Sequence, residues 1–397
     1  MSHKKKLMIL GAGKNEVPAV IRAKERGLET IVIDMNPSAP ALALADKAFI
    51  PKTTDTKEYV DFAVREGIDG VMTVSAEALV RKISAIANTL GLPGISEEMA
   101  FISTDKSAMR EVLHKNSIPA PHFIKACTLE EALKGAGRLS LPLVIKPVDQ
   151  AGSRGVFKIN EISEVTRYFE TSRKISRSGK VIIEEYIEGV HSTVDAITAD
   201  GKTHIIGISD KVNILTPNII IMDVAFPPAY SKEMVKGVEK LVCGMFEKLG
   251  FSYGHSHTEV VVTDRGPIVI EFAARSGGGL LPSDILPHLC GFDVIDKLIS
   301  LALGEPLGID KVVLSNGADL RFFNSPTGRL KKINGIGDAL KIKGVHKLDF
   351  IVKDGDLIKP LLEGKDRAGF VITHGKDREE AVRAADAVEK IIKFEMY

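Results

Sequence analysis

The sequence predicts a mixed α/β and α+β protein, and three observations carry this prediction. Residues 6–90 alternate strand-like apolar runs with helix-like segments, which is typical of an open, parallel α/β sheet. β-Branched runs separated by glycine-containing turns then indicate antiparallel hairpins in the middle of the chain. The chain has 397 residues, too many for one hydrophobic core, so two to three domains are expected.

Composition excludes several classes of protein. Hydrophobic residues make up 44% and charged residues 26% of the chain, as in ordinary soluble globular proteins. The net charge of +1 gives no reason to expect a surface that binds nucleic acid or membrane. No apolar run approaches the roughly 20 residues of a membrane span. Three cysteines without paired spacing suit a reducing compartment and do not indicate a zinc site. The sequence thus predicts a cytoplasmic protein.

The opening segment reads as strand, glycine turn, helix and strand, over residues 7–10, 11–13, 17–24 and 30–33. This order resembles a dinucleotide-binding βαβ unit, including the acid Asp34 that follows the second strand. The third glycine position of that motif is occupied by Glu16, which would place negative charge where a pyrophosphate binds. An NAD-dependent oxidoreductase is therefore kept only as an alternative function.

The alternation continues, with strands at 47–50 and 70–74 and helices at 56–66 and 77–90. A further helix is expected to run to about residue 115, with residues 103–106 as its capping segment. After it, a short strand over 141–147 carries Lys146 into the small-residue loop 150–156. Backbone N–H groups and the Ser153 hydroxyl can donate to oxyanions there, and Lys146 supplies a positive charge. This pattern suits polyphosphate binding; an ordinary hairpin turn is the alternative.

The stretch 181–189 is an apolar strand that runs into an acidic segment. A strand of this kind can present backbone groups and a carboxylate to a purine edge, and a solvated acidic strand end is the alternative. Two strands around residues 200–201 and a helix over 231–249 follow.

The β-branched runs 260–263 and 268–270 flank a glycine-containing turn at 264–266. If this turn is centred on Arg265, Glu259 lies opposite Glu271. Directly opposed carboxylates repel each other, and a divalent cation such as Mg²⁺ would neutralise them. Arg275 leads from this hairpin into a glycine run. An exposed edge hairpin is the alternative. Beyond it, a helical region to about residue 303, short strands over 312–373 and a helix over 378–394 are expected.

Taken together, these stretches resemble the ATP-grasp superfamily over essentially the whole chain. The matching motifs occur in the family's order at residues 104–106, 144–147, 152–156, 184–189, 254–259 and 270–278. The start resembles the Rossmann-like pre-ATP-grasp domain. The end, through residues 367–370 and the following helix, resembles the small β-rich C-terminal piece of biotin carboxylase, glycinamide ribonucleotide synthetase and the carbamoyl-phosphate synthetase-like ligases. The resemblance implies domains at 1–105, 106–305 and 306–397, with a mobile lid at about 119–187.

The resemblance also implies roles for single residues. Nucleotide contacts would come from Lys106, Lys146, Ser153, Arg154, Gly155, Val156, Glu184, Glu185 and Ile187. Glu259 and Glu271 would bind Mg²⁺, with Mn²⁺ as an alternative, and Arg275 and Lys146 would be catalytic. Two positions depart from the family pattern. Ala273 stands where relatives often have a metal-binding asparagine, and His191 stands where many have an acid for the ribose hydroxyls.

The implied activity is an ATP-dependent carboxylate–amine ligase that works through an acyl phosphate. Its substrates would be a small-molecule carboxylate and an amine, and the family favours a homodimer. Residues 276–279 would lie near the carboxylate, with residues 75–77 and Arg321 as further lining groups. These residue types do not distinguish an amino acid from a ribonucleotide. A non-catalytic ATP-grasp protein that only binds nucleotide is a further alternative.

Overall fold

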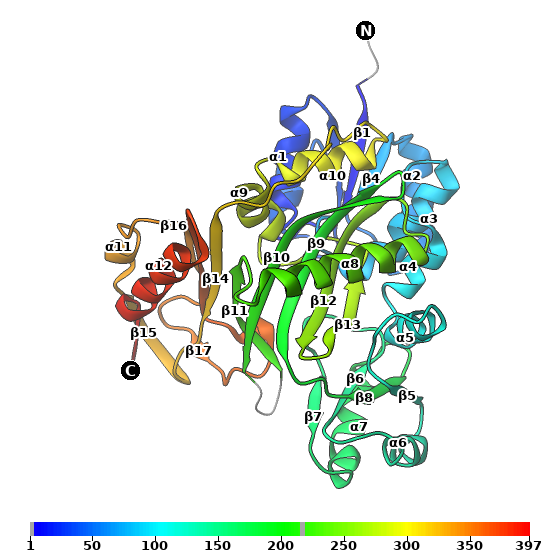
Figure 1. The fold of residues 1–397 in the computed structure, drawn as a ribbon. Coiled ribbons are helices and arrows are strands. Elements are labelled where there is room, and N and C mark those ends of the chain that lie inside the picture. The colour runs from blue at the N-terminus through cyan, green and yellow to red at the C-terminus, as the bar shows by residue number, and fades with distance from the viewer. Residues whose placement is uncertain (1–3, 215–218) are drawn as a thin grey trace.

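The computed structural model describes residues 4–214 and 219–397 (Figure 1). The N-terminal part is a four-stranded parallel sheet in the order β3-β2-β1-β4. Its elements are β1 (Lys6–Leu10), α1 (Val17–Glu25), β2 (Glu29–Ile33), η1 (Pro40–Leu44), β3 (Lys47–Phe49), α2 (Thr56–Glu66), β4 (Gly70–Met72), η2 (Glu77–Leu79), α3 (Val80–Leu90) and α4 (Glu97–Ile102). The predicted open, parallel α/β sheet is confirmed.

Alternation along β1 explains why helices cover both faces of this sheet. Leu7 and Ile9 belong to one buried cluster, and Met8 and Leu10 belong to another. Successive strand residues point to opposite faces, so a continuously apolar strand needs cover on both sides. The first of these clusters continues into the rest of the molecule through residues of α10 (Val294–Ala302).

A second, smaller sheet follows α5 (Lys106–Lys115) and has the strand order β5-β8-β6-β7. Its elements are β5 (Phe123–Ala126), α6 (Leu129–Ala136), β6 (Leu143–Pro147), β7 (Phe157–Ile159), α7 (Ser163–Ile175) and β8 (Val181–Glu185). All its strand pairs are antiparallel, and it has a hydrophobic core of its own. In Figure 1 this small sheet projects from the remainder of the molecule beside β12 and β13.

The largest element is an antiparallel sheet of eight strands, in the order β13-β12-β9-β10-β11-β14-β18-β16. Its strands are β9 (Val190–Ala199), β10 (Lys202–Ile214), β11 (Ile220–Phe226), β12 (Gly254–Thr263), β13 (Gly266–Ala273), β14 (Gly317–Phe323), β16 (Val345–Phe350) and β18 (Gly369–Gly375). Helix α8 (Lys232–Lys248) packs on one face through a shared apolar cluster. Residues of α9 (Leu286–Cys290) and α10 cover the other face. We call the face opposite α8 the site face, because Glu259, Val261 and Glu271 on this face line a cavity.

The C-terminal part continues this large sheet and adds a small one. The small one has the order β17-β15-β19 and is built from β15 (Gly328–Asn334), β17 (Leu357–Ile358) and β19 (Lys393–Met396). The remaining helices are η3 (Leu281–Ile285), α11 (Ile336–Ala339), η4 (Gly364–Asp366) and α12 (Arg378–Ile391). The predicted helix over 378–394 was thus too long, because Lys393 and Phe394 leave α12 and pair with β15.

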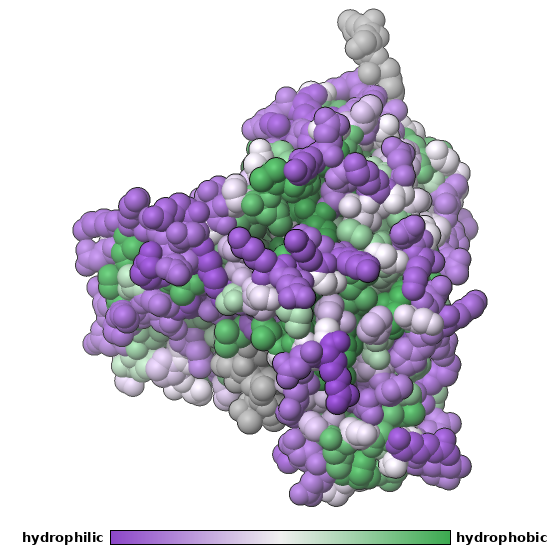
Figure 2. Space-filling view, viewed as in Figure 1, coloured by the Kyte–Doolittle hydropathy of each residue, from purple (hydrophilic) through white to green (hydrophobic). Residues whose placement is uncertain are grey.

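The face that Figure 2 shows is mainly hydrophilic, with separate hydrophobic areas. Among residues 4–214 and 219–397, no helix combines the length and the apolar character needed to cross a lipid bilayer.

Candidate active site

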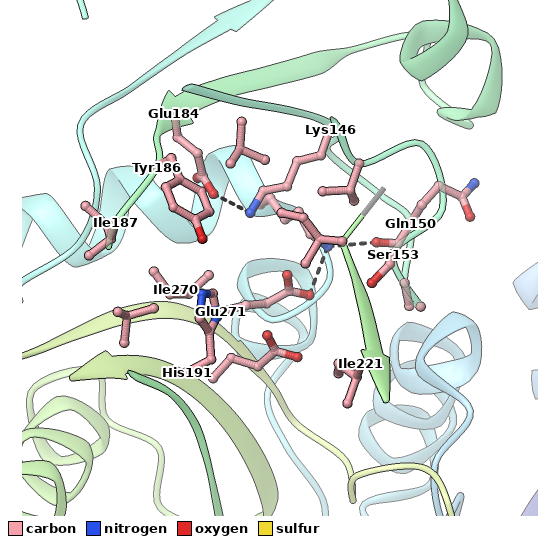
Figure 3. A pocket seen from close by; sticks show the side chains of 18 of the residues that line it. Lys146, Gln150, Ser153, Glu184, Tyr186, Ile187, His191, Ile221, Ile270 and Glu271 are labelled. Atoms are coloured by element: carbon pink, nitrogen blue, oxygen red, sulfur yellow. Dashed lines mark hydrogen bonds and ion pairs between the residues drawn. The ribbon is translucent and has the colours of Figure 1, made fainter. Parts of the chain in front are cut away.

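A cavity lies between the small sheet and the site face of the large sheet (Figure 3). Strands β6 and β8 supply one wall, and strands β9, β12 and β13 supply the other. The predicted site residues that line it are Lys106, Lys146, Ser153, Val156, Glu184, Glu185, Ile187, His191, Glu259, Glu271 and Arg275. Arg154 and Gly155 do not line this cavity, although the sequence placed them with the nucleotide; both border other cavities.

Glu259 and Glu271 face each other across β12 and β13, as predicted, but by a different route. The turn is centred between Asp264 and Arg265, because Thr263 pairs with Gly266. A β-bulge at Ile270 then shifts the register by one residue and brings the two glutamates together. The predicted turn centre was wrong, and the predicted pairing is confirmed.

The bulge also explains why Ile270 and Glu271, which are adjacent on β13, both line the cavity. Val269 and Phe272 both belong to the cluster under α8, although they are three residues apart. Strict alternation would send them to opposite faces. The extra residue restores their common face and leaves Ile270 and Glu271 both lining the cavity.

Each of the two carboxylates has its own lysine. Lys106 Nζ lies 2.9 Å from Glu271 Oε1 and donates to the Gln150 carbonyl at 2.7 Å. Lys106 is the first residue of α5, where the Asp105 side chain caps the helix by accepting from two backbone N–H groups. Burial lowers the pKa of Lys106, but the nearby carboxylates of Glu271 and Glu77 raise it overall, so this lysine stays charged.

Lys211 on β10 is the partner of Glu259, at 2.7 Å, and sequence reasoning missed it. Burial raises the pKa of Glu259, but the Lys211 ammonium and its hydrogen bond lower it to about 2. The available signal was a lysine next to Asp210 in a strand that carries several polar side chains. It carried no information about a partner 48 positions away along the chain.

A third acid, Glu184, lies near the end of β8, where the strand leads into the segment 186–189; we call this junction the hinge. Glu184 accepts from Arg110 Nε at 3.0 Å and forms an ion pair with Lys146 on β6 (Figure 3). Burial raises the pKa of Glu184, but Arg110 and Lys146 lower it overall. Burial lowers the pKa of Lys146, against the effect of Glu184. Sequence reasoning missed Arg110, which lies on α5 and fixes the Glu184 carboxylate.

Val144, Ile187 and the ring of Tyr186 line the cavity at the end nearest this hinge. Further apolar residues of the lining are Val156, Ile221, Val261 and Ile270. Burial lowers the pKa of His191, whose ring lies 6.4 Å from that of Tyr186. Within residues 4–214 and 219–397, the Nε2 atom of His191 is buried and has no hydrogen-bond partner. The apolar part of the cavity suits a planar base. The imidazole nitrogen of His191 suits a hydrogen bond with a sugar hydroxyl.

At the opposite end, Arg275 Nη2 lies 2.7 Å from Glu77 Oε2, which joins the large sheet to the N-terminal part. Nearby, His257 on β12 lies 3.0 Å from the fully buried Asp195 through its Nδ1 atom. The predicted lining residues 75–77 border an adjoining cavity together with Arg275. Arg321 lies elsewhere, paired with Asp223, Asp319 and Asp386, so its predicted place at the site was wrong.

The glycine turn of the first βαβ unit does not offer a dinucleotide site. Glu16 is buried at the start of α1 and accepts from the Ser75 backbone N–H at 3.3 Å. Asp34 accepts from the Ala12 backbone N–H at 2.8 Å, and the two acids thus serve internal contacts. A pyrophosphate would meet a carboxylate where it needs hydrogen-bond donors.

No cluster of three or more His, Cys, Asp or Glu side chains able to hold a metal ion occurs in the described part of the chain. Mg²⁺ in nucleotide sites commonly takes only one or two protein carboxylates and completes its shell with phosphate oxygens and water. The opposed Glu259 and Glu271 fit that smaller requirement.

Comparisons with known proteins agree with this geometry. A family model described as an ATP-grasp domain matches residues 139–284, and one described as L-amino acid ligase C-terminal domain 2 matches residues 321–397. An uncharacterized protein of Sinorhizobium fredii, y4rH, is 27% identical over 380 residues, which cover 93% of this chain and 77% of y4rH.

Two solved structures share the fold over their full length and that of this chain. An L-amino acid ligase from Bacillus licheniformis superposes with a TM-score of 0.84 at 22% identity, with 100% of each chain covered. A phosphoribosylglycinamide synthetase from Anaerococcus prevotii gives 0.79 at 20% identity, again with 100% of each chain covered. Residues 139–284 thus match an ATP-grasp domain and residues 321–397 match an L-amino acid ligase C-terminal domain, in agreement with the fold and with the residues that line the cavity.

Proposed function

We propose that this protein joins a small-molecule carboxylate to an amine, with ATP converted to ADP and phosphate. In the first step a carboxylate oxygen takes the γ-phosphoryl group of ATP, and the bond from that group to ADP breaks. In the second step the amine nitrogen bonds to the acyl carbon, the carbon–oxygen bond to phosphate breaks, and the amine gives up a proton. The observation that carries this proposal is the carboxylate pair Glu259–Glu271 at the centre of a cation-rich cavity.

Phosphoryl transfer needs alignment and charge neutralisation more than covalent help from the protein. Lys106 and Lys146 are both buried beside the cavity, where a positive charge acts strongly on bound phosphates. Arg275 supplies a further positive charge at the end away from the hinge. In this proposal Arg275 acts on the transferring group, and Lys106 and Lys146 bind the other phosphates of the nucleotide. Glu259 and Glu271 would hold Mg²⁺, which supplies charge neutralisation between the two anionic reactants.

The hinge end fits the adenosine portion of ATP. The apolar slot formed by residues such as Val144 and Ile187 would take the base. The Nε2 atom of His191, which has no hydrogen-bond partner among the described residues, would hydrogen-bond a ribose hydroxyl, in place of the acid that relatives often carry. Glu184 contributes indirectly, because its carboxylate is already bound by Arg110 and Lys146. Glu185 and Ile187 also line the cavity and would lie beside the base.

Three further expectations belong to this proposal. The chain would divide into domains at 1–105, 106–305 and 306–397, although the large sheet continues across the second boundary. The small sheet would act as a lid over the nucleotide. The enzyme would work in the cytoplasm as a homodimer on small-molecule substrates.

Release of ADP and phosphate from MgATP, measured against a mixed library of carboxylic acids, amino acids and amines, tests the proposal. A stimulated turnover with a product lighter than its two substrates by one water is expected. The Glu271→Gln variant should abolish it. The Glu247→Gln variant, changed at an exposed position on α8, should not. ATP binding without turnover across the library would favour a nucleotide-binding protein without ligase activity.

A further inference from the structure

A second cavity adjoins the nucleotide cavity and shares Glu77, Ala151 and Arg275 with it. One wall comes from the N-terminal part, at residues 75–78. The other comes from the small sheet and its loops, through Asp149, Arg154 and Arg177. Arg275 therefore stands between the two cavities. A substrate in the second cavity would meet the transferring phosphoryl group at this arginine.

In the second cavity the positive side chains other than Arg275 are free to bind a ligand, whereas the two carboxylates are already engaged. Of its two carboxylates, Glu77 is paired with Arg275. Asp149 accepts from the Ser176 hydroxyl and from two backbone N–H groups, those of Arg177 and Ser178. Both acids are thus engaged within the protein, and neither neutralises Arg154 or Arg177.

The guanidinium groups of these two arginines lack an acidic partner within residues 4–214 and 219–397. Arg154 donates through Nε to the Ala151 carbonyl at 3.1 Å and forms no ion pair there. Arg177 makes no side-chain hydrogen bond or ion pair in that part of the molecule. Both side chains are exposed, so an incoming ligand can reach them. A guanidinium group is the side chain best suited to bind carboxylate or phosphate with two parallel hydrogen bonds.

A further cation, Lys82 on α3, is affected by the charge of Arg177. Burial lowers the pKa of Lys82, and Arg177 lowers it further, against the opposite effect of Asp55. An anion bound at Arg177 would relieve the repulsion between these two cations.

We propose that the carboxylate substrate carries a second anionic group, a further carboxylate or a phosphate, and that Arg154 and Arg177 bind it. This inference rests on the ligase function proposed above. It moves Arg154 from the nucleotide, where the sequence placed it, to the substrate. The reacting carboxylate would lie at Arg275, and the second anion would lie toward the small sheet. Arg154 and Arg177 would then determine specificity without taking part in phosphoryl transfer.

Calorimetric titration of the full-length protein, saturated with MgADP, tests this inference directly. Glutarate, L-glutamate and O-phospho-L-serine each carry two anionic groups and serve as the dianionic probes, with butyrate, L-glutamine and L-serine as counterparts that carry one anionic group. At least one dianionic probe should bind roughly tenfold more tightly than its counterpart, as expected for charge-assisted hydrogen bonds. The glutamate and phosphoserine arms separate a carboxylate from a phosphate as the second group. Equal or absent binding of both members in every pair would overturn the inference.

Arg154→Gln and Arg177→Gln should each remove most of that preference and leave the binding of ATP unchanged. Arg173→Gln is the matched control, because Arg173 on α7 pairs with Glu170 and lines neither cavity. Loss of ATP affinity in Arg154→Gln, with the substrate preference intact, would return this residue to the nucleotide and refute the proposal.

ADP release with the same probes separates the two claims. Turnover with only the probes of lower charge would support a ligase and contradict the anion site. Preferential binding of a dianionic probe, without ADP release from any acid in the library, would support the anion site and contradict the ligase function.

Discussion

Glu259 and Glu271 lie directly opposite each other on β12 and β13, and each is paired with a different lysine from a distant part of the chain. Lys211 lies 2.7 Å from Glu259, and Lys106 lies 2.9 Å from Glu271. The two ammonium groups balance a pair of carboxylates that would otherwise repel each other inside the protein. A metal ion bound with ATP would compete with both lysines for these oxygen atoms.

Replacing Glu271 by Gln should lower kcat for ADP release by about 100-fold or more, since it removes an oxygen charge needed to hold the metal beside the phosphates. The Mg²⁺ concentration for half-maximal activity should rise at the same time. A steady-state titration of Mg²⁺ at fixed ATP measures both quantities. An unchanged Mg²⁺ requirement in Glu271→Gln would show that this carboxylate does not bind the metal.

Replacing Lys211 by Met should leave Glu259 without its partner and lower the free energy of unfolding. We expect a loss of about 1–2 kcal/mol, below that of a fully buried pair, because the Glu259 side chain is 34% exposed. MgATP should raise the melting temperature more in this variant than in the wild type, since the cation takes over part of the role of the ammonium. Thermal unfolding with and without MgATP measures this, and Lys240→Met, at an exposed position on α8, is the control. If MgATP raised the melting temperature equally in Lys211→Met and in Lys240→Met, the proposed competition between Lys211 and the metal would be contradicted.

Arg275→Ala should lower kcat about 100-fold or more and change the KM for ATP by less than about threefold, because the guanidinium acts on charge that develops in the transition state. The same change removes the ion-pair partner of the partly buried Glu77, so stability must be separated from catalysis. The double variant Glu77→Gln/Arg275→Ala should recover stability, measured by chemical denaturation, without recovering turnover. Equal losses in kcat and ATP affinity would indicate that Arg275 serves ground-state binding.

The sequence was informative where chemistry is local. Local patterns predicted three parts of the site: the lysine before a glycine loop, the strand with an acidic end and the hairpin with two glutamates. The residues that these patterns indicated line one cavity, namely Lys146, Glu184, Glu259, Glu271 and Arg275. The sheet of β1 to β4 was equally predictable from the sequence, because its apolar strands and intervening helices follow one another without interruption.

What the sequence could not provide were contacts between distant segments. Arg110 and Lys211 occupy a helix and a strand that look ordinary, and only the fold brings them to Glu184 and Glu259. The end of α12 was misjudged for the same reason, since pairing with β15 draws Phe394 into a strand against its local helical pattern. The loop motif indicates where the backbone turns and leaves the direction of a long side chain open, so it could not show that Arg154 lies outside the cavity that Ser153 and Val156 line.

Three histidines stack where the C-terminal part meets the helices that follow the glycine run. The His374 ring lies between those of His288 and His346, with ring centres 4.0 Å and 4.2 Å away. His374 Nε2 donates to the Asp284 carbonyl at 2.7 Å, while the Asp284 carboxylate accepts from His346 at 3.3 Å and from Lys347 at 3.1 Å. Burial, followed by the two neighbouring imidazoles, lowers the pKa of His374 to about 4.

This shift should make the protein less stable in mild acid. In the unfolded chain His374 takes up a proton near its ordinary pKa of 6.5, whereas in the folded protein it stays neutral until about pH 4. The unfolded state therefore binds more protons as the pH falls through this range, and the contribution of His374 to stability, about 2–3 kcal/mol at most, is lost between pH 6.5 and 4. In His374→Phe, which keeps an aromatic ring in the stack but cannot titrate, the free energy of unfolding should fall less between pH 7 and pH 5 than in the wild type. Urea denaturation at the two pH values measures the difference, and parallel losses in both proteins would show that the stack does not couple protonation to folding.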